Sequence, residues 1–356
     1  MVPPRLVRRL VVAPAIPLLT VLLVVSLPLT LIAAAVASTF LPGRWRALRV
    51  LYFLLVGLVV ETVMLVWLLA LWVASVFGRR LQEPAWQDRH YVAMRRYLDV
   101  IVRAGTRVFR VGFDVDVDDL AMHPRETTAP LIVLARHAGP GDSFLLVHAL
   151  LQLDRRPRIV LKSSMQWAPA IDIGLNRVPS YFVPPRAPRG TGTTAVRTLA
   201  AGMSARDALI IFPEGRNYTP QRRLISIDKL EEQGRHEEAE AAREMRHVLA
   251  PRSGGAIAAL EGAPAADVAF VTHAGLEHFI TLADLWRGLP VDADVAVKAW
   301  LVPRAELPRA REAKDAWLQW WWRRIDAWLI DHFGTEVVPD AVVEELETSQ
   351  VEPAPE

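Results

Sequence analysis

The sequence of 356 residues contains no cysteine and few lysines. The absence of cysteine excludes disulfide bonds, thiolate metal ligands and a cysteine nucleophile. Arginine carries almost all of the positive charge, because lysine occurs only at Lys162, Lys229, Lys298 and Lys314. The arginines do not alternate with aromatic residues in any one stretch, so the composition gives little support to binding of nucleic acid, and we expect no such partner.

Charge is also scarce in the first eighty residues. No residue from Leu10 to Gly43 is charged, and Glu61 is the one charged residue from Val50 to Gly78. Both stretches exceed the roughly 20 residues that cross a bilayer core, and neither has the polar face of a helix on a soluble core. We therefore predict that residues 1–80 form a membrane-anchoring transmembrane helical hairpin.

The processing and orientation of this region leave alternatives open. Basic residues before the first run and the sequence AVAS at 35–38 are also found in cleaved secretory signals, but the run is far longer than a signal h-region of about 7–15 residues. Arginines flank both ends of the pair of runs, which favours a location in the cell membrane with the remainder on the cytoplasmic face. Glu61 near the centre of a span is either functional or hydrogen-bonded within the hairpin.

Beyond Gly78, short apolar runs alternate with amphipathic stretches. Helical segments between strands are typical of βαβ units, so the predicted fold class is α/β, with a mainly parallel sheet flanked by helices. This domain is expected over residues 81–335, before an acidic disordered tail at 336–356. Strands are predicted at 112–120, 130–136, 158–162, 179–183, 207–215, 267–275 and 292–303, and helices at 143–153, 194–205, 222–249 and 313–333, with a short helical or irregular piece at 165–176.

The segment LIVLARHAGPGDSFLL joins a predicted strand to a predicted helix and contains His137 and Asp142. Residues five apart on a continuous helix would diverge, but the Gly-Pro-Gly turn between these two lets their side chains converge. Asp142 would then accept the Nδ1 proton of His137 and leave Nε2 as a base toward a substrate hydroxyl. The helix N-terminus beside them would favour an anionic group. The alternative is an aspartate that only caps the helix.

A serine nucleophile is a competing hypothesis for the same segment. The sequence GDSF at 141–144 resembles the nucleophile block of GDS-type hydrolases, with Ser143 as the attacking residue. That class also needs Asp-x-x-His late in the chain, and none of the nine histidines has an aspartate three residues before it. No Gly-x-Ser-x-Gly sequence is present either. We therefore disfavour Ser143.

A second pattern, IIFPEGRNYTP, ends a predicted buried strand with Glu214 and Gly215, and an acid at a strand exit is typical of a functional site. From here the chain resembles the glycerolipid acyltransferase family, which includes 1-acylglycerol-3-phosphate acyltransferases. Its members carry His-x4-Asp, a Gly-containing block ending in an apolar strand and Arg, and Phe-Pro-Glu-Gly-Thr-Arg, after an apolar N-terminal segment. This chain has HAGPGD, GLNRVPSYFVPPR, FPEGRN and a further block, VLAPRSGG, in that order over about residues 132–302.

The resemblance implies that His137 is a general base and Asp142 its partner. The reaction would move a fatty acyl group from acyl-CoA or acyl carrier protein to a lysophospholipid hydroxyl, with 1-acylglycerol-3-phosphate giving phosphatidic acid as the simplest case. A hydroxyl at neutral pH needs a base, whereas a thioester is already activated. We therefore expect no metal, no cofactor and no covalent enzyme intermediate. A catalytically weak lipid-binding or scaffolding homologue is the alternative.

The resemblance also implies which residues bind the acceptor lipid. Glu214 and Gly215 would shape this site. Arg186 matches the arginine that follows the family's apolar strand, although an extra proline before it makes Arg189 a second candidate. Arg252 lies in the last of the four blocks.

One departure from the family pattern concerns the acceptor headgroup. Where members have Thr-Arg after the Glu-Gly pair, this chain has Arg216 and Asn217. Either Arg216 reaches the same phosphate from one position earlier, or the headgroup differs from a simple phosphomonoester.

Overall fold

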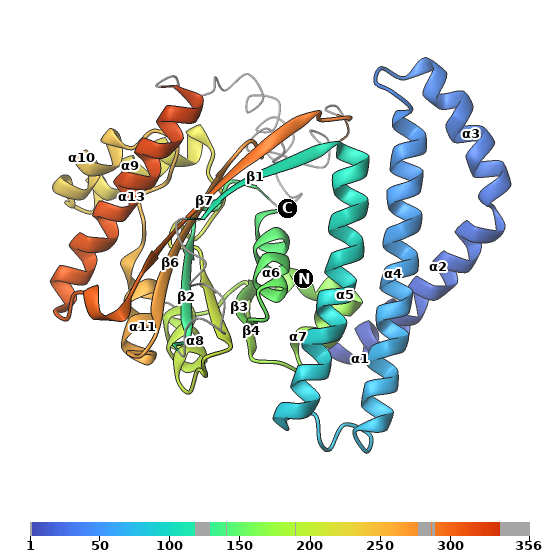
Figure 1. Cartoon of the computed structure of the whole chain (residues 1–356), viewed down its shortest axis with the longest axis horizontal. Coiled ribbons are helices and arrows are strands. Elements are labelled where there is room, and N and C mark those ends of the chain that lie inside the picture. Colours follow the sequence, from blue (N-terminus) through green and yellow to red (C-terminus); the bar gives the residue numbers. More distant parts are fainter. Residues whose placement is uncertain are drawn as a thin grey trace, which may run out of the picture.

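The computed structural model describes residues 2–117, 129–139, 141–188, 190–276, 286 and 289–334. A central twisted sheet is covered by helices on both faces, and the apolar N-terminal helices lie outside one helical layer (Figure 1). The strands are β1 Val111–Val117, β2 Leu131–Ala135, β3 Arg156–Lys162, β4 Ser180–Val183, β5 Asp207–Ile211, β6 Asp267–Ala274 and β7 Ala293–Val302. Their order is β1-β7-β6-β2-β5-β3-β4, and every neighbouring pair is parallel except β6 and β7. The predicted mainly parallel sheet is confirmed.

The helices account for both covered faces of this sheet. Leu131 and Val133 of β2 face one hydrophobic core, and Ile132 and Leu134 face the other. Burial on both faces explains why the central strands read as continuous apolar runs. The first core lies under α4 Arg46–Ala74, α5 Pro84–Phe109, α6 Asp142–Gln152 and α7 Pro169–Leu175, and the second under α8 Thr191–Ala200, α9 Pro220–Glu232, α10 His236–Glu244, α11 Ser253–Gly262 and α13 Arg311–Phe333.

The expected helix over 222–249 is wrong as a single element. The chain forms α9 and α10 instead, and the break between them contains Gly234 at φ +72°. A left-handed glycine ends a helix readily because it carries no Cβ. Only part of the predicted strand 112–120 lies within the described residues, and the predicted tail at 336–356 lies outside them.

The first apolar run is also interrupted. After α1 Arg5–Val7 and a π-helical turn, Arg8–Val12, the run forms α2 Ala13–Val25 and α3 Leu27–Phe40. Pro28 stands in the first turn of α3 and has no N–H to continue the hydrogen-bond ladder of α2. The two helices form a bent arch along α4 (Figure 1). Arg5–Val25 and Arg46–Ala74 are both long and apolar enough to cross a membrane.

Two tryptophans of α13, Trp321 and Trp322, pack onto the sheet. Trp321 stacks on Phe270 of β6 with ring centroids 4.3 Å apart, and Trp322 is fully buried. Helix α13 lies on the opposite side of the sheet from α2, α3 and α4 (Figure 1). A membrane surface that lies along the outer face of α2, α3 and α4 would therefore not contact α13.

Glu61 joins the apolar hairpin to the α/β domain. Its Oε1 accepts a hydrogen bond from the Ala170 backbone N–H in α7 at 2.8 Å. Its Oε2 accepts a hydrogen bond from the Tyr97 hydroxyl in α5, also at 2.8 Å. Met64 and Leu68, on the same face of α4, are buried in the first hydrophobic core. The carboxyl in the apolar helix thus has a hydrogen-bonding role outside the hairpin itself.

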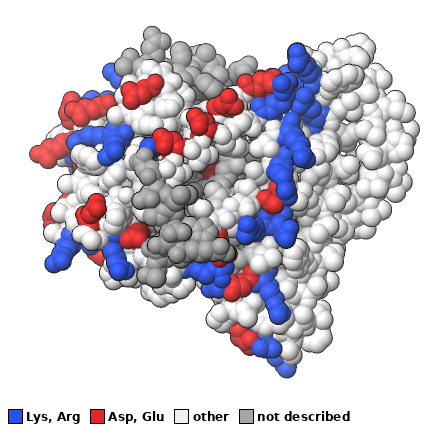
Figure 2. All heavy atoms as spheres, in the orientation of Figure 1, with Lys and Arg blue, Asp and Glu red and all other residues white. Residues whose placement is uncertain are grey.

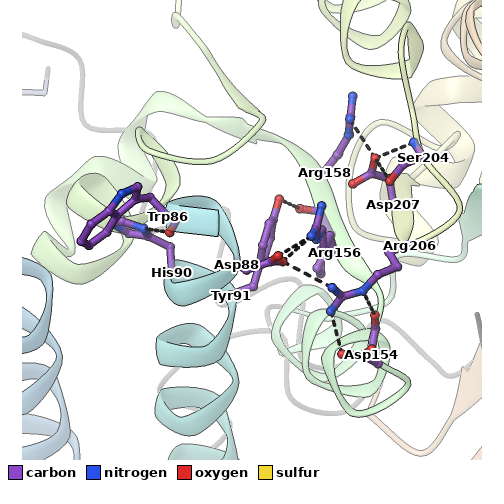
Figure 3. Close-up of polar contacts among 11 residues, drawn as sticks. Trp86, Asp88, His90, Tyr91, Asp154, Arg156, Arg158, Ser204, Arg206 and Asp207 are labelled. Carbon is purple, nitrogen blue, oxygen red and sulfur yellow. Dashed lines mark hydrogen bonds and ion pairs between the residues drawn. The ribbon is translucent and has the colours of Figure 1, made fainter. Parts of the chain in front are cut away.

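Helix α5 is in turn fixed to the amino ends of β3 and β5 (Figure 3). Asp88 accepts hydrogen bonds from Arg156 at 2.5 Å and Arg206 at 3.5 Å, and the Tyr91 hydroxyl donates to the Pro157 carbonyl at 3.3 Å. This network lies at the sheet edge opposite the carboxyl ends of the parallel strands. Through α4 and α5, the apolar helices are held in one position relative to the sheet.

We expect Glu61→Ala to lower the free energy of unfolding by about 1–3 kcal/mol, because it leaves a buried backbone N–H and the Tyr97 hydroxyl without their acceptor. Tyr97→Phe is the matched control, since it removes only one of the two bonds and should cost less. Chemical unfolding of the detergent-solubilised protein measures both. A loss no larger in Glu61→Ala than in Tyr97→Phe would mean that the Ala170 contact adds nothing.

Candidate active site

The carboxyl ends of β2, β5 and β6 meet at one edge of the sheet, because β2 pairs in parallel with both of the other strands. His137 follows β2, Glu214 follows β5, and His273 lies at the end of β6. Loops that leave such an edge are where α/β folds place ligand sites. The strand topology therefore brings together three titratable side chains that are far apart in the sequence.

His137 and Asp142 are in contact across the turn that joins β2 to α6. His137 Nδ1 lies 3.1 Å from Asp142 Oδ2. The imidazole is 20% exposed, its Nε2 has no hydrogen-bond partner among the described residues, and its ring stacks on Phe212 at 4.4 Å. The ring is thus fixed by a carboxylate and an aromatic face while Nε2 remains accessible, as the predicted pairing requires.

The Asp142 carboxylate does not cap its own helix. Its Oδ2 accepts hydrogen bonds from the backbone N–H groups of Ala138 at 2.6 Å and Gly139 at 2.8 Å, and α6 has no side-chain cap bond. Burial of Asp142 opposes its ionisation, but His273, the hydrogen bond with His137 and the backbone N–H groups outweigh this and hold the pKa of Asp142 well below its usual range. The group is therefore a fixed anion beside the imidazole.

Glu214 is fully buried behind the histidine rather than open to a ligand. Its Oε1 accepts a hydrogen bond from the His137 backbone N–H at 3.2 Å, and its Oε2 accepts one from the Leu249 N–H at 3.1 Å. Burial raises the pKa of Glu214 to about 8, against the opposing effects of Arg136 and the two N–H groups. Glu214 thus ties the end of β2 to the segment before α11.

Sequence reasoning missed Arg136 and His273. The buried Arg136 guanidinium donates to the His247 carbonyl through Nε at 3.1 Å and to the His273 carbonyl through Nη1 at 2.9 Å. His273 Nε2 lies 3.3 Å from Asp142 Oδ1. The available signal was the position of His273 near the end of a strand parallel to the one before His137.

Three arginines form a cationic cluster next to Gly215. A side chain at Gly215, whose φ is +72°, would lie 3.6 Å from Arg252 Nη1, so this guanidinium covers the glycine turn. The pKa of Arg252 is lowered by burial and by neighbouring Arg216, and the pKa of Arg222 is lowered by the same two causes. Among the residues the structure describes, no carboxylate pairs with Arg216 or Arg252. The cluster is suited to an anionic group.

The other candidate residues from the sequence are Arg186, Arg189 and Ser143, and none of those that the structure describes is hydrogen-bonded to His137 or Asp142. Arg186 is exposed in the turn after β4, at the same sheet edge but two strands away from β5, which corresponds to roughly 10 Å. Arg189 lies outside the described residues. No hydrogen bond joins Ser143 to a histidine within the described part of the chain. In that part, no group of three or more acidic or histidine side chains is arranged to hold a metal ion either.

The chain was compared with family models, curated protein sequences and solved structures. A family model described as Acyltransferase matches residues 115–273, which include His137, Asp142 and Glu214. The structure is similar to the crystal structure of the 1-acyl-sn-glycerophosphate (LPA) acyltransferase PlsC from Thermotoga maritima, with a TM-score of 0.49 and 17% sequence identity. That similarity covers 81% of this chain and 98% of the other. No curated protein sequence matches the chain significantly.

The pKa of Glu214 predicts a pH dependence of stability. A carboxyl whose pKa rises to about 8 on folding keeps its proton in the folded state, while the unfolded chain releases it above about pH 4.3. The contribution of Glu214 to the free energy of unfolding is therefore greatest at low pH. It falls by roughly 1 kcal/mol per pH unit until the pH reaches about 8.

Glu214→Gln should flatten this slope in chemical unfolding between pH 5 and 8, whereas Glu232→Gln on the exposed end of α9 should not. Equal slopes in wild type and Glu214→Gln would mean that Glu214 is ionised in the folded protein.

Proposed function

We propose that this chain is a glycerolipid acyltransferase, which transfers a fatty acyl group from a thioester to the hydroxyl of a lysophospholipid. The match of an Acyltransferase family model to residues 115–273 supports this proposal. The donor is acyl-CoA or acyl carrier protein, and the simplest acceptor is 1-acylglycerol-3-phosphate. The observation that carries this proposal is the contact of Asp142 with His137 Nδ1, which leaves the exposed Nε2 as the basic nitrogen.

In this mechanism His137 Nε2 removes the proton of the acceptor hydroxyl as its oxygen attacks the thioester carbonyl carbon. The adjacent Asp142 anion stabilises the imidazolium that forms. When the tetrahedral intermediate collapses, the C–S bond breaks and the leaving thiolate takes the proton from Nε2. The products are the ester and a free thiol, and His137 is neutral again.

The cluster of Arg216, Arg222 and Arg252 would bind the acceptor phosphate. A phosphate here would neutralise a group of cations whose mutual repulsion and burial already lower the pKa of two of them. Arginine suits this role because its planar fork of donors matches phosphate oxygens. Gly215 keeps the turn open beneath Arg252. The cluster supports an anionic acceptor such as a lysophosphatidic acid.

The apolar helices would attach this site to a membrane surface. Length and composition predict a hairpin that crosses the bilayer. However, α4 is packed along α5, so any charged residues of α5 would accompany α4 into the bilayer. Helix α5 carries three exposed arginines seven residues apart, which places them on one side of the helix, and Arg110 follows as its C-cap: Arg89, Arg96, Arg103 and Arg110.

Figure 2 shows a band of basic residues running lengthwise beside an uncharged surface formed by the N-terminal helices. If α4 stood across the bilayer, the middle of this band would enter the hydrocarbon, at a cost of about 2.5–3.5 kcal/mol for each central arginine. We therefore propose that α2, α3 and α4 lie in one leaflet, with the arginine band at the level of the lipid headgroups.

The dyad can be tested in purified protein with radiolabelled acyl-CoA and lysophosphatidic acid. We expect His137→Ala to lower kcat by about 10²–10⁴-fold, because a positioned base contributes that much. Asp142→Asn should also lower it strongly, since the anion beside the imidazole is lost. His148→Ala is the control, because His148 contacts Asp99 and not the dyad. Near-normal turnover in His137→Ala would refute the assignment.

The phosphate cluster predicts a change in KM. Arg216→Ala and Arg252→Ala should each raise the acceptor KM about 10–100-fold, the effect of one charge-assisted hydrogen bond, with little change in the donor KM. Arg235→Ala, which removes an exposed partner of Glu238, should change neither. Equal increases in both KM values would place the cluster at the donor instead.

Single cysteines at Thr39 and Gln87 in this cysteine-free chain report the membrane arrangement. In sealed vesicles, a membrane-impermeant maleimide should label both from the side that labels a reference cysteine at Glu232. Attachment to one leaflet keeps both ends of the hairpin on that side. Labelling of Thr39→Cys only after the vesicles are opened would instead show that the hairpin crosses the bilayer.

A further inference from the structure

His273 is a buried imidazole that the mechanism above does not use. It lies near the carboxyl end of β6, is 9% exposed, and directs Nε2 toward Asp142 Oδ1 at 3.3 Å. Asp142 is therefore placed between two histidines from different segments of the chain. Buried polar groups without partners are costly, so two such groups 3.3 Å apart stabilise the fold when they pair.

The two carboxylate oxygens of Asp142 have different surroundings. Oδ2 receives His137 Nδ1 and the backbone N–H groups of Ala138 and Gly139. Oδ1 has no hydrogen bond of ordinary geometry among the described residues, and His273 Nε2 is the side-chain nitrogen beside it, at 3.3 Å. Without His273, this oxygen of a buried anion would lose its described ion-pair contact.

The position of the His273 ring is itself fixed. Its backbone carbonyl accepts a hydrogen bond from Arg136, which also donates to the His247 carbonyl. Among the described residues, neither ring nitrogen of His273 has a hydrogen bond of ordinary geometry. Asp142 Oδ1, 3.3 Å from Nε2, is likewise without one. Pairing of these two unsatisfied groups requires the proton of a neutral ring to be on Nε2.

We propose that His273 is a positioning residue for acyl transfer, whose Nε2–H holds Asp142 Oδ1 so that Oδ2 keeps the His137 imidazole oriented for proton abstraction. This inference rests on the proposed function, since it requires His137 to act as the base.

Two substitutions separate hydrogen bonding from packing. His273→Leu fills the space without a donor and should lower kcat about 10–100-fold, the effect of losing one hydrogen bond to a charged group, with both KM values little changed. His273→Gln retains an N–H near the Nε2 position and should recover most of the activity. Wild-type kcat in His273→Leu, or equal losses in both variants at unchanged melting temperature, would overturn the proposal.

A double-mutant cycle tests whether His273 acts through Asp142. In the Asp142→Asn background, His273→Leu should cost less than twofold further, because the carboxylate it positions is already gone. Losses that multiply fully would show that the two residues act independently, and would contradict the proposal.

Histidine-labelled protein gives a readout that does not need activity. The imidazole 15N chemical shifts of His273, identified by their absence in His273→Gln, should change at one fixed pH in Asp142→Asn. Unchanged chemical shifts would overturn the contact even if acyl transfer is observed. Changed chemical shifts in a protein that transfers no acyl group would retain the contact and reject the proposed function.

Discussion

The buried carboxylate of Asp142 is the group on which the site depends. It is an anion at the end of a turn, with two backbone N–H groups and two imidazoles around it. The contacts with Ala138 and Gly139 shape the turn itself, so the interaction that orients His137 also determines the path of the chain from β2 into α6. The orientation of His137 and the local path of the chain therefore depend on one set of hydrogen bonds.

A second constraint is the rigid connection between the apolar helices and the sheet. Glu61 in α4 bonds to α5 and α7, and Asp88 in α5 bonds to arginines at the amino ends of β3 and β5. A membrane surface that holds the outer face of α2, α3 and α4 would consequently hold the whole domain at a fixed distance. An enzyme whose acceptor is a lipid gains from this arrangement, because its site need not search for the surface at each turnover.

The pattern of apolar residues predicted most of the fold, because strands buried on both faces of a sheet consist almost entirely of apolar residues. The alternation of apolar runs with amphipathic stretches was enough for the α/β class and the parallel sheet. The same pattern wrongly predicted one helix over 222–249. Charged helix-forming residues stand on both sides of Gly234, so the sequence does not indicate that α9 ends before it and α10 begins after it. The dyad was predictable because His137 and Asp142 are joined by a short turn.

The rest of the site depends on contacts between distant segments. Glu214 has the expected motif, but its side chain turns inward to backbone groups of residues 77 and 35 positions away. His273 is contributed by a strand that only the sheet order places beside β2. The Glu61 partner Ala170 is likewise 109 residues away. No local pattern encodes such pairs, and they follow only from the packing of complete elements.

The central claim is that His137 acts as a general base, and chemical rescue of His137→Ala tests it most directly. Exogenous imidazoles of graded pKa can occupy the vacated space and accept the hydroxyl proton. We expect them to restore acyl transfer, with a rate that rises with the basicity of the imidazole. Failure of every imidazole to restore transfer, together with wild-type turnover in His137→Asn, would contradict the account, because an amide can position a substrate but cannot serve as a base near neutral pH.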